Sequence, residues 1–218
     1  MKLGIFSDVH ANLQALQACL LEMARLGCHR LICLGDVATL GREPIATLRL
    51  LMNLECLFIR GNHDRYLLDP ASIDQYDTVE LVRRDVRNVA SLLHDEDRVF
   101  LRSFVPHATL ELAGTRLCFF HGSPISDEIM LLPHLPKEKL FESTSSVDAD
   151  WYIGGHIHST YTLDFKGKRL INAGSLGAPF VGWNPAKNEP LFGSDGSFLT
   201  IEAMGNNLSV TFHTVPLG

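Results

Sequence analysis

The chain has 218 residues, of which 46% are hydrophobic and 20% are charged, so it can bury a sizeable core without disulfide support. Its net charge of −6 argues against a dedicated nucleic-acid surface or a basic membrane-binding face. The cysteines number five and no stretch approaches the roughly 20 apolar residues of a membrane span. We therefore expect a single domain, residues 1–218, in the reducing cytoplasm, with its oligomeric state left open.

The first predicted unit is a strand over residues 3–7, which ends directly at Asp8 and His10. Asn12 can cap the helix that follows, because apolar residues recur at helical spacing from Leu13 until Gly27 stops the pattern. An acidic residue and a histidine thus stand together at the end of the first strand.

Two further strands repeat this arrangement. Residues 30–34 form an apolar run that ends at Asp36, and Pro44 begins a short predicted helix through residue 51. Residues 56–59 form a third strand, followed by a tight turn, Gly61–Asp64, that carries Asn62 and His63. Alternating strands and helices favour a parallel sheet, and such sheets place their ligands at the carboxyl ends of the strands.

The second half combines helices with a larger number of strands. Asp77 with Glu80 resembles a capping box, and an apolar stripe then continues to Leu93. Helices are also expected at residues 96–104 and 137–143, and strands at 108–112, 116–120, 151–153, 160–165, 168–171, 197–202 and 208–213. Residues 174–196 are expected to form a loop.

Five predicted strand ends carry side chains that can bind metal ions. In chain order these are Asp8 with His10, Asp36, Asn62 with His63, His121, and His156 with His158. Imidazole, carboxylate and carboxamide ligands without a thiolate suit Mn, Fe, Zn, Co or Ni, whereas a dedicated Ca or Mg site would be nearly all oxygen. The pattern favours a pair of divalent transition-metal ions.

In these motifs the sequence resembles the calcineurin-like metallophosphoesterases. Asp-x-His, Gly-Asp, Gly-Asn-His-Asp, a lone His and Gly-His-x-His occur in order, and the resemblance spans about residues 3 to 175. The late motif at Asn172–Ser175 is most similar to the small prokaryotic phosphodiesterase branch, although Ala173 stands where that branch usually has Pro. The resemblance implies an α/β fold of four layers, αββα, in which a β-sandwich is flanked by helices.

The resemblance also implies a role for each site residue. One metal would be held by Asp8, His10, Asp36 and His158, and the other by Asp36, Asn62, His121 and His156. Asp36 and a shared water would bridge the two ions, with Mn favoured and Fe, Zn, Ni or Co as alternatives, and the water would attack phosphorus as hydroxide. His63 would stabilise the phosphoryl oxygens or protonate the leaving group, with Asp64 fixing its tautomer and orientation.

The predicted activity is that of a phosphodiesterase acting on a small phosphate ester, such as a nucleotide. Two divalent cations outweigh the carboxylates of Asp8 and Asp36, so the site would attract an anion within an acidic protein. A phosphomonoesterase or protein phosphatase with the same metals is the alternative. A non-catalytic scaffold, such as the retromer subunit with this fold, is less favoured because every ligand position is filled. Arg42 and Arg60 lie near the metal-bearing loops and can either bind phosphate or form ordinary surface contacts.

Overall fold

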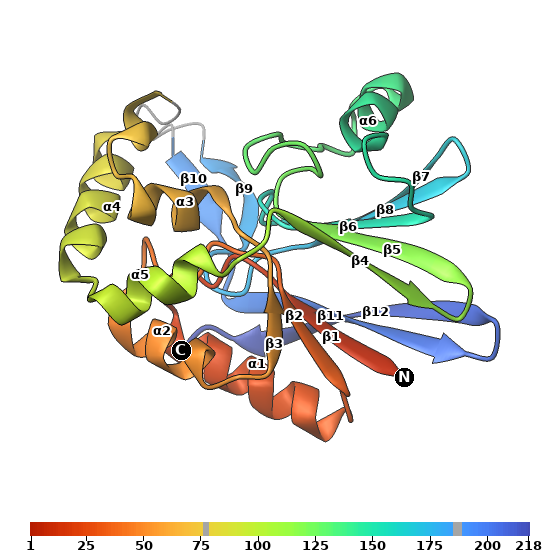
Figure 1. Ribbon diagram of the computed structural model, residues 1–218, viewed down its shortest axis with the longest axis horizontal. Coiled ribbons are helices and arrows are strands. Elements are labelled where there is room, and N and C mark those ends of the chain that lie inside the picture. The colour runs from red at the N-terminus through yellow and green to blue at the C-terminus, as the bar shows by residue number, and fades with distance from the viewer. Residues whose placement is uncertain (76–78, 185–188) are drawn as a thin grey trace.

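Residues 1–75, 79–184 and 189–218 are described by a computed structural model, in which two five-stranded sheets pack face to face (Figure 1). The first sheet has the order β12 (Asn207–Pro216), β11 (Asp195–Met204), β1 (Lys2–Phe6), β2 (Arg30–Cys33) and β3 (Cys56–Phe58). The second has the order β4 (His107–Leu112), β5 (Thr115–Phe120), β6 (Trp151–Gly154), β8 (Lys168–Ala173) and β7 (Thr160–Phe165).

Each sheet contains three adjacent parallel strands. Strands β1, β2 and β3 run parallel, and β11 and β12 complete that sheet with antiparallel pairing. In the second sheet β5, β6 and β8 run parallel, with β4 and β7 antiparallel at the two edges. The parallel strands of each sheet therefore end at the same edge of that sheet.

Helices cover the outer faces of both sheets. Figure 1 shows α1 (Leu13–Arg25) and α2 (Pro44–Met52) below the first sheet and α6 (Lys137–Thr144) above the second. Helices α3 (Asn62–Leu68), α4 (Glu80–Leu92) and α5 (Asp95–Arg102) lie beyond the strand ends, with a 3-10 turn at Ser72–Gln75. The expected four layers, αββα, are confirmed.

The alternation of side chains along β1 explains how this strand packs against both the second sheet and the helices. Leu3 and Ile5 are fully buried in the core between the sheets, whereas Phe6 packs on the other face into the core beneath the helices. Gly4 also faces the helices, since a Cβ there would meet Met23 Sδ of α1 at 2.8 Å. Each fully buried Leu, Ile or Phe contributes on the order of 1.5 to 3 kcal/mol, so both faces of β1 stabilise the sandwich.

Local signals at the helix starts are borne out in part. Asn12 caps α1, because its Oδ1 accepts a hydrogen bond from the Ala15 backbone N–H at 3.0 Å. The predicted turn at Gly61–Asp64 is instead the first turn of α3, with Gly61 at the N-cap. The capping role of Asp77 lies outside the described residues, and Val79 stands at the N-cap of α4.

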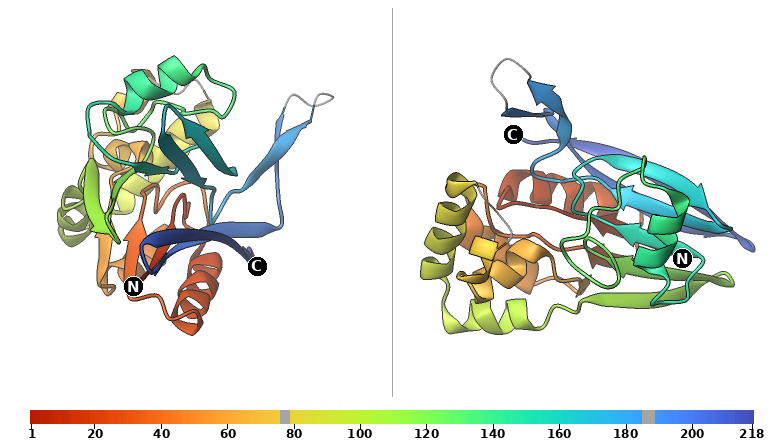
Figure 2. Two further views of the ribbon diagram at one scale, coloured as in Figure 1. Left: turned by 90° about the vertical axis from the view of Figure 1, so that its right-hand side faces the viewer. Right: turned by 90° about the horizontal axis from the view of Figure 1, so that it is seen from above.

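The expected loop at residues 174–196 contains regular structure. Strands β9 (Phe180–Asn184) and β10 (Glu189–Phe192) pair antiparallel, and Figure 2 shows this hairpin projecting from the body of the molecule. Residues 185–188 between them lie outside the described residues. The loop was predicted from the glycines and prolines in this stretch. Those residues lie beside short segments with β propensity, such as Phe180–Val181, and the pairing of two such segments produces the hairpin.

Within the described ranges, no helix combines the length and the apolar character that crossing a bilayer requires. Helices α1 and α4 have 13 residues each, against the roughly 20 of a membrane span.

Candidate metal centre

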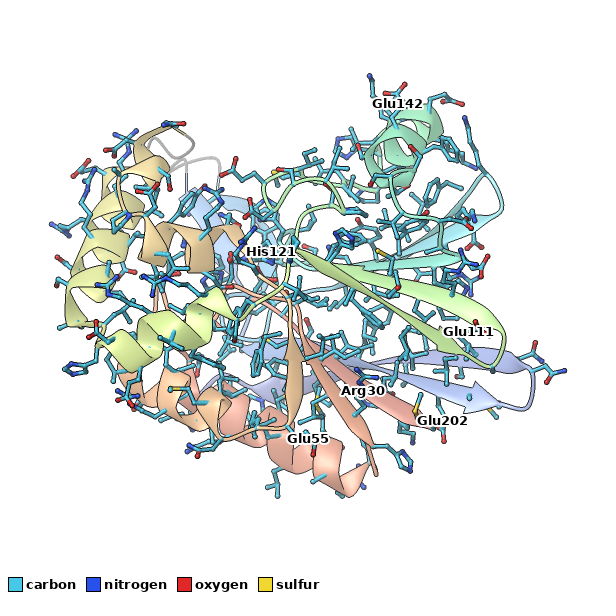
Figure 3. The ribbon with its side chains drawn as sticks, viewed as in Figure 1. Arg30, Glu55, Glu111, His121, Glu142 and Glu202 are labelled. Atoms are coloured by element: carbon cyan, nitrogen blue, oxygen red, sulfur yellow. The ribbon has the colours of Figure 1, made fainter. Side chains whose placement is uncertain are left out.

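The predicted ligands gather where the parallel strands of both sheets end. Asp8 and His10 follow β1, Asp36 follows β2, and Asn62 follows β3, all in the first sheet. The second sheet contributes His121 after β5 and His156 with His158 after β6. Figure 3 shows His121 at the end of β5 nearest to the helices. The two sheets thus bring distant parts of the chain to one shared edge.

Asp8, His10 and His158 form the first candidate ligand group, with one ligand atom from each lying within 4.8 Å of the others. His10 Nε2 and His158 Nε2 are 3.1 Å apart, and Asp8 Oδ1 lies 3.1 Å from His158 Nε2. Asp8 Oδ1 and His10 Nδ1 are buried and have no hydrogen-bond partner among the described residues. Buried polar atoms without partners are costly, and a cation beside Asp8 Oδ1, where His10 Nε2 and His158 Nε2 also converge, would remove the cost for that carboxylate oxygen.

The second candidate group consists of Asp36, His121 and His156, whose ligand atoms also lie within 4.8 Å of one another. His121 Nε2 is 3.3 Å from Asp36 Oδ2 and 3.1 Å from Asn62 Oδ1, so the predicted carboxamide ligand joins this group. All predicted metal ligands therefore lie in two neighbouring groups, and Asp36, which the prediction shares between both metals, lies within the second group.

Hydrogen bonds at the far side of two imidazoles leave the near nitrogen for a metal. His121 Nδ1 donates to the Leu34 carbonyl at 2.7 Å, and His158 Nδ1 donates to the Ala178 carbonyl at 2.7 Å. Such bonds fix the tautomer and orient Nε2, as is usual for metal-binding histidines. The donor set, nitrogen and oxygen without sulfur, fits Mn, Fe, Co, Ni or Zn.

The backbone at the site is strained in a way that serves ligand placement. Asp8, His10, Asp36, His156 and His158 all have φ between 46° and 68°, in the left-handed region that non-glycine residues seldom adopt. Such conformations cost on the order of 1 to 3 kcal/mol each and cluster at functional sites.

Two glycines allow the loops to approach each other. A Cβ at Gly155 would lie 2.0 Å from Ser7 Oγ and 2.8 Å from Asp8 Oδ2, and a Cβ at Gly61 would lie 2.0 Å from Asp36 Oδ1. No larger residue fits at either position without displacing a ligand carboxylate or its immediate neighbour.

The buried carboxylates create a strong demand for positive charge. Burial opposes ionisation of Asp36, but the imidazoles of His121 and His63 hold its pKa well below the ordinary value. Burial also opposes a charge on His121, yet Asp36 and Asp8 raise its pKa to about 10. By contrast, burial and neighbouring imidazoles lower the pKa of His10 to about 3 and that of His156 to about 4. Neutral imidazoles such as those of His10 and His156 are in the state that binds metals, whereas His121 would release its proton when a metal ion enters.

His63 lies beside the ligand groups and belongs to neither. Its ring packs edge-on against that of His10, with the centroids 5.4 Å apart. The predicted role of Asp64 at this ring is wrong, because His63 Nδ1 is hydrogen-bonded to Thr39 Oγ1 at 2.9 Å. Asp64 instead accepts hydrogen bonds from the backbone N–H groups of Asp36, Val37 and Gly61 at 2.9 to 3.0 Å.

Asp64 therefore connects the start of α3 to the loop that carries Asp36. Burial and the adjacent Asp36 carboxylate raise the pKa of Asp64 to about 7, against the effect of the three amides. The carboxylate of Asp64 thereby satisfies three buried backbone N–H donors, whereas a hydrogen bond to the imidazole would satisfy one donor.

Residues of the late motif hold the ligand loops. Ser175 Oγ donates to the Asp8 carbonyl at 2.9 Å, and Asn172 Nδ2 donates to the Gly155 carbonyl at 2.5 Å. Ala173, which replaces the proline usual in the resembling branch, ends β8 and is fully buried. Sequence reasoning missed Thr39 altogether, since a threonine three residues after Asp36 carries no distinctive spacing.

Arg42 and Arg60 line different cavities. Arg42 is exposed and shares a cavity of about 310 Å³ with His10 and Asn12. Arg60 lines a cavity of about 370 Å³ with Arg65, whose guanidinium is held by Asp127 and Glu128 of the loop after β5. Of these two cavities, the one beside Arg42 has a candidate metal ligand, His10, in its lining, and the one beside Arg60 does not.

Comparisons with known proteins agree with this geometry. The chain is 29% identical over 204 residues to the uncharacterised protein MJ0912 of Methanocaldococcus jannaschii, which covers 84% of this chain and 79% of that protein. The structure is similar to that of the hypothetical protein PH1004 from Pyrococcus horikoshii OT3, with a TM-score of 0.78, 18% identity and coverage of 99% of this chain and 88% of that chain. It is also similar to a metallophosphoesterase from Sphaerobacter thermophilus, with a TM-score of 0.71, 22% identity and the same coverage of 99% and 88%.

The two structural likenesses establish a shared fold, and a family model extends the relationship to the sequence. The model for the calcineurin-like phosphoesterase superfamily domain matches residues 1–187, which include every candidate ligand described above. With this match, the two converging ligand groups and the four-layer fold, the chain belongs to the calcineurin-like phosphoesterase superfamily.

Proposed function

We propose that the chain is a phosphodiesterase that depends on two divalent transition-metal ions, with Mn favoured and Fe, Zn, Ni or Co as alternatives. The observation that carries the proposal is the presence of two separate groups of buried ligands, Asp8–His10–His158 and Asp36–His121–His156, at one edge of the sandwich. Asp36 is the candidate bridge, because its Oδ2 lies 3.3 Å from His121 Nε2, and this nitrogen in turn lies 4.0 Å from Asp8 Oδ1 of the other group.

The metal ions would supply a nucleophile at neutral pH and neutralise charge on the phosphoryl group. The residues of the chain hold and orient these ions and the substrate. His63 is the candidate for stabilising the phosphoryl oxygens or for protonating the leaving group, since its ring adjoins His10 without entering either ligand group.

A small phosphate ester, such as a nucleotide, is the proposed substrate. The cavity of about 310 Å³ beside His10 has the size of an ordinary small-molecule site, and Arg42 on its wall supplies a positive charge. A phosphomonoesterase or protein phosphatase remains the alternative within the same chemistry. A scaffold without activity is less favoured, because no ligand position in the described site is vacant. The five free cysteines are compatible with the proposed reducing, cytoplasmic location.

The test is an activity panel on purified protein that has been stripped with a chelator and then reloaded. Bis(p-nitrophenyl) phosphate, p-nitrophenyl phosphate and nucleotide esters are assayed with Mn, Fe, Zn, Ni, Co or Mg added singly. We expect turnover to require a transition metal and kcat/KM to be highest for a diester. Undiminished turnover in the stripped protein contradicts the proposal, and a higher kcat/KM for monoesters favours the alternative.

A further inference from the structure

A buried hydrogen bond joins a threonine that no motif includes to the histidine beside the metal ligands. Thr39 is fully buried, and its Oγ1 lies 2.9 Å from His63 Nδ1. Among the described residues this is the single hydrogen bond of the Thr39 hydroxyl. We propose that Thr39 is the positioning residue for His63, in place of the carboxylate of Asp64.

Side-chain carboxylates hold the main chain on both sides of Thr39. Upstream, the carboxylate of Asp64 accepts from the backbone N–H groups of Asp36 and Val37 at 2.9 and 3.0 Å. Downstream, Asp85 Oδ2 on α4 accepts from the backbone N–H of Leu40 at 2.6 Å. The segment between these anchors is short, so the Thr39 hydroxyl is presented to the imidazole in one place.

The hydrogen bond decides which ring nitrogen is available for chemistry. Because Nδ1 of His63 is engaged by Thr39, Nε2 is the nitrogen left for the phosphoryl group or the leaving group. Packing completes the orientation, since the ring stands edge-on to both His10 and Tyr66, with centroid distances of 5.4 and 5.6 Å.

A threonine partner differs chemically from a carboxylate partner. A hydroxyl can both donate and accept a hydrogen bond, whereas an ionised carboxylate only accepts and stabilises an imidazolium. Thr39 therefore fixes the orientation of the ring without committing it to the charged form. This inference deepens the proposed function and rests on it for its kinetic readout.

The kinetic test compares Thr39→Val, which removes the hydroxyl at nearly constant volume, with Thr39→Ser, which keeps it. Thr39→Val is expected to lower kcat about tenfold at unchanged KM and metal content, the effect of losing roughly one hydrogen bond of average strength. Thr39→Ser should restore most of the rate. The matched control is Thr47→Val in α2, because Thr47 is also fully buried but its Oγ1 has no partner among the described residues. The control should keep the wild-type rate.

A double variant separates a positioning role from a general loss of structure. In the His63→Ala background, Thr39→Val should change kcat by less than about twofold, since a residue that acts through His63 has nothing left to position. Additive effects of the two substitutions would overturn the proposal.

An NMR readout keeps the inference independent of the reaction. Histidine ring nitrogens are labelled with ¹⁵N, spectra are recorded with Zn²⁺ added and again without metal, and the His63 signals are identified by their loss in His63→Ala. Thr39→Val should shift the His63 Nδ1 signal, while Thr39→Ser and Thr47→Val should leave it near the wild-type value. Unchanged His63 signals in Thr39→Val overturn the inference even if the enzyme is active. Conversely, a shifted signal in a protein without ester hydrolysis supports the Thr39 contact and counts against the proposed function alone.

Discussion

Substituting Gly61 by alanine should damage the metal site although the backbone conformation of residue 61 itself suits alanine. Gly61 has φ of −87° and ψ of 171°, an extended conformation that alanine adopts freely. The added Cβ, however, would lie 2.0 Å from Asp36 Oδ1 and 2.7 Å from the Asp36 backbone nitrogen. The effect of the substitution therefore arises from contact with the proposed bridging ligand.

The size of the effect follows from these distances. A Cβ does not approach other heavy atoms within 3.0 Å in real proteins, so the Asp36 carboxylate must move by on the order of 1 Å. A misplacement of that size costs about 10² in rate, and it should weaken metal binding as well. Overpacking costs about 1 to 3 kcal/mol, while alanine restricts the unfolded chain and returns about 0.4 to 1 kcal/mol. We expect a net loss of roughly 1 to 2 kcal/mol.

Three measurements test this expectation: Mn²⁺ titration of stripped protein by calorimetry, turnover of the best substrate, and urea unfolding. The control is Gly114→Ala, in the turn between β4 and β5, where alanine strains the backbone but makes no close contact. Gly114 has φ of +76° and no atom within 4 Å of the added Cβ, so alanine there is strained but touches nothing. The control should lose stability, by roughly 1 kcal/mol, and keep its metal affinity. Wild-type Mn²⁺ affinity and turnover in Gly61→Ala would refute the placement of Asp36 against Gly61.

Three further predictions concern the roles of single side chains. Asp36→Asn should weaken both metal-binding steps in a calorimetric titration, whereas Asp8→Asn should keep one near-native step; equal losses in the two variants would argue against a bridge. His63→Ala should retain two metals per chain by elemental analysis and lose about 10² to 10⁴ in rate, and a variant with one metal missing would make His63 a ligand. Arg65→Lys keeps the charge but not the paired hydrogen bonds to Asp127 at 2.9 and 3.0 Å, so urea unfolding should show a loss of about 1 to 2 kcal/mol, and no measurable loss would mean that the pair contributes little.

The amino-acid pattern predicts most of the fold because its signals are local. Runs such as residues 30–34 and 116–120 are apolar, bounded by turn residues, and become β2 and β5. Asn12 performs the capping role that its position indicates. The β9–β10 hairpin was missed because pairing between two segments decides it, and residue preferences within 174–196 favour a loop.

The same division explains the candidate site. Ligand types at strand ends are visible in sequence, because parallel strands carry their ends to one edge whatever the packing details. The partner of His63 was not visible, since Asp64 adjoins it in sequence while Thr39 reaches it only through the fold. The prediction from sequence therefore named Asp64, the next residue in the chain, as the hydrogen-bond partner of His63 instead of Thr39. The bonds that Asp64 makes to three backbone amides could not be deduced before the two loops were placed side by side.

Each candidate ligand group draws on both sheets, and this has a consequence for stability. Asp8 and His10 come from the first sheet and His158 from the second, while Asp36 comes from the first and His121 from the second. An ion in either group would act as a clasp between the two halves of the sandwich, and separating the sheets would require its release. Folding and metal loading would then be linked, adding about 2.7 kcal/mol for each ion present at a hundred times its dissociation constant. Metal supply would govern how long the folded chain persists as well as whether it can react.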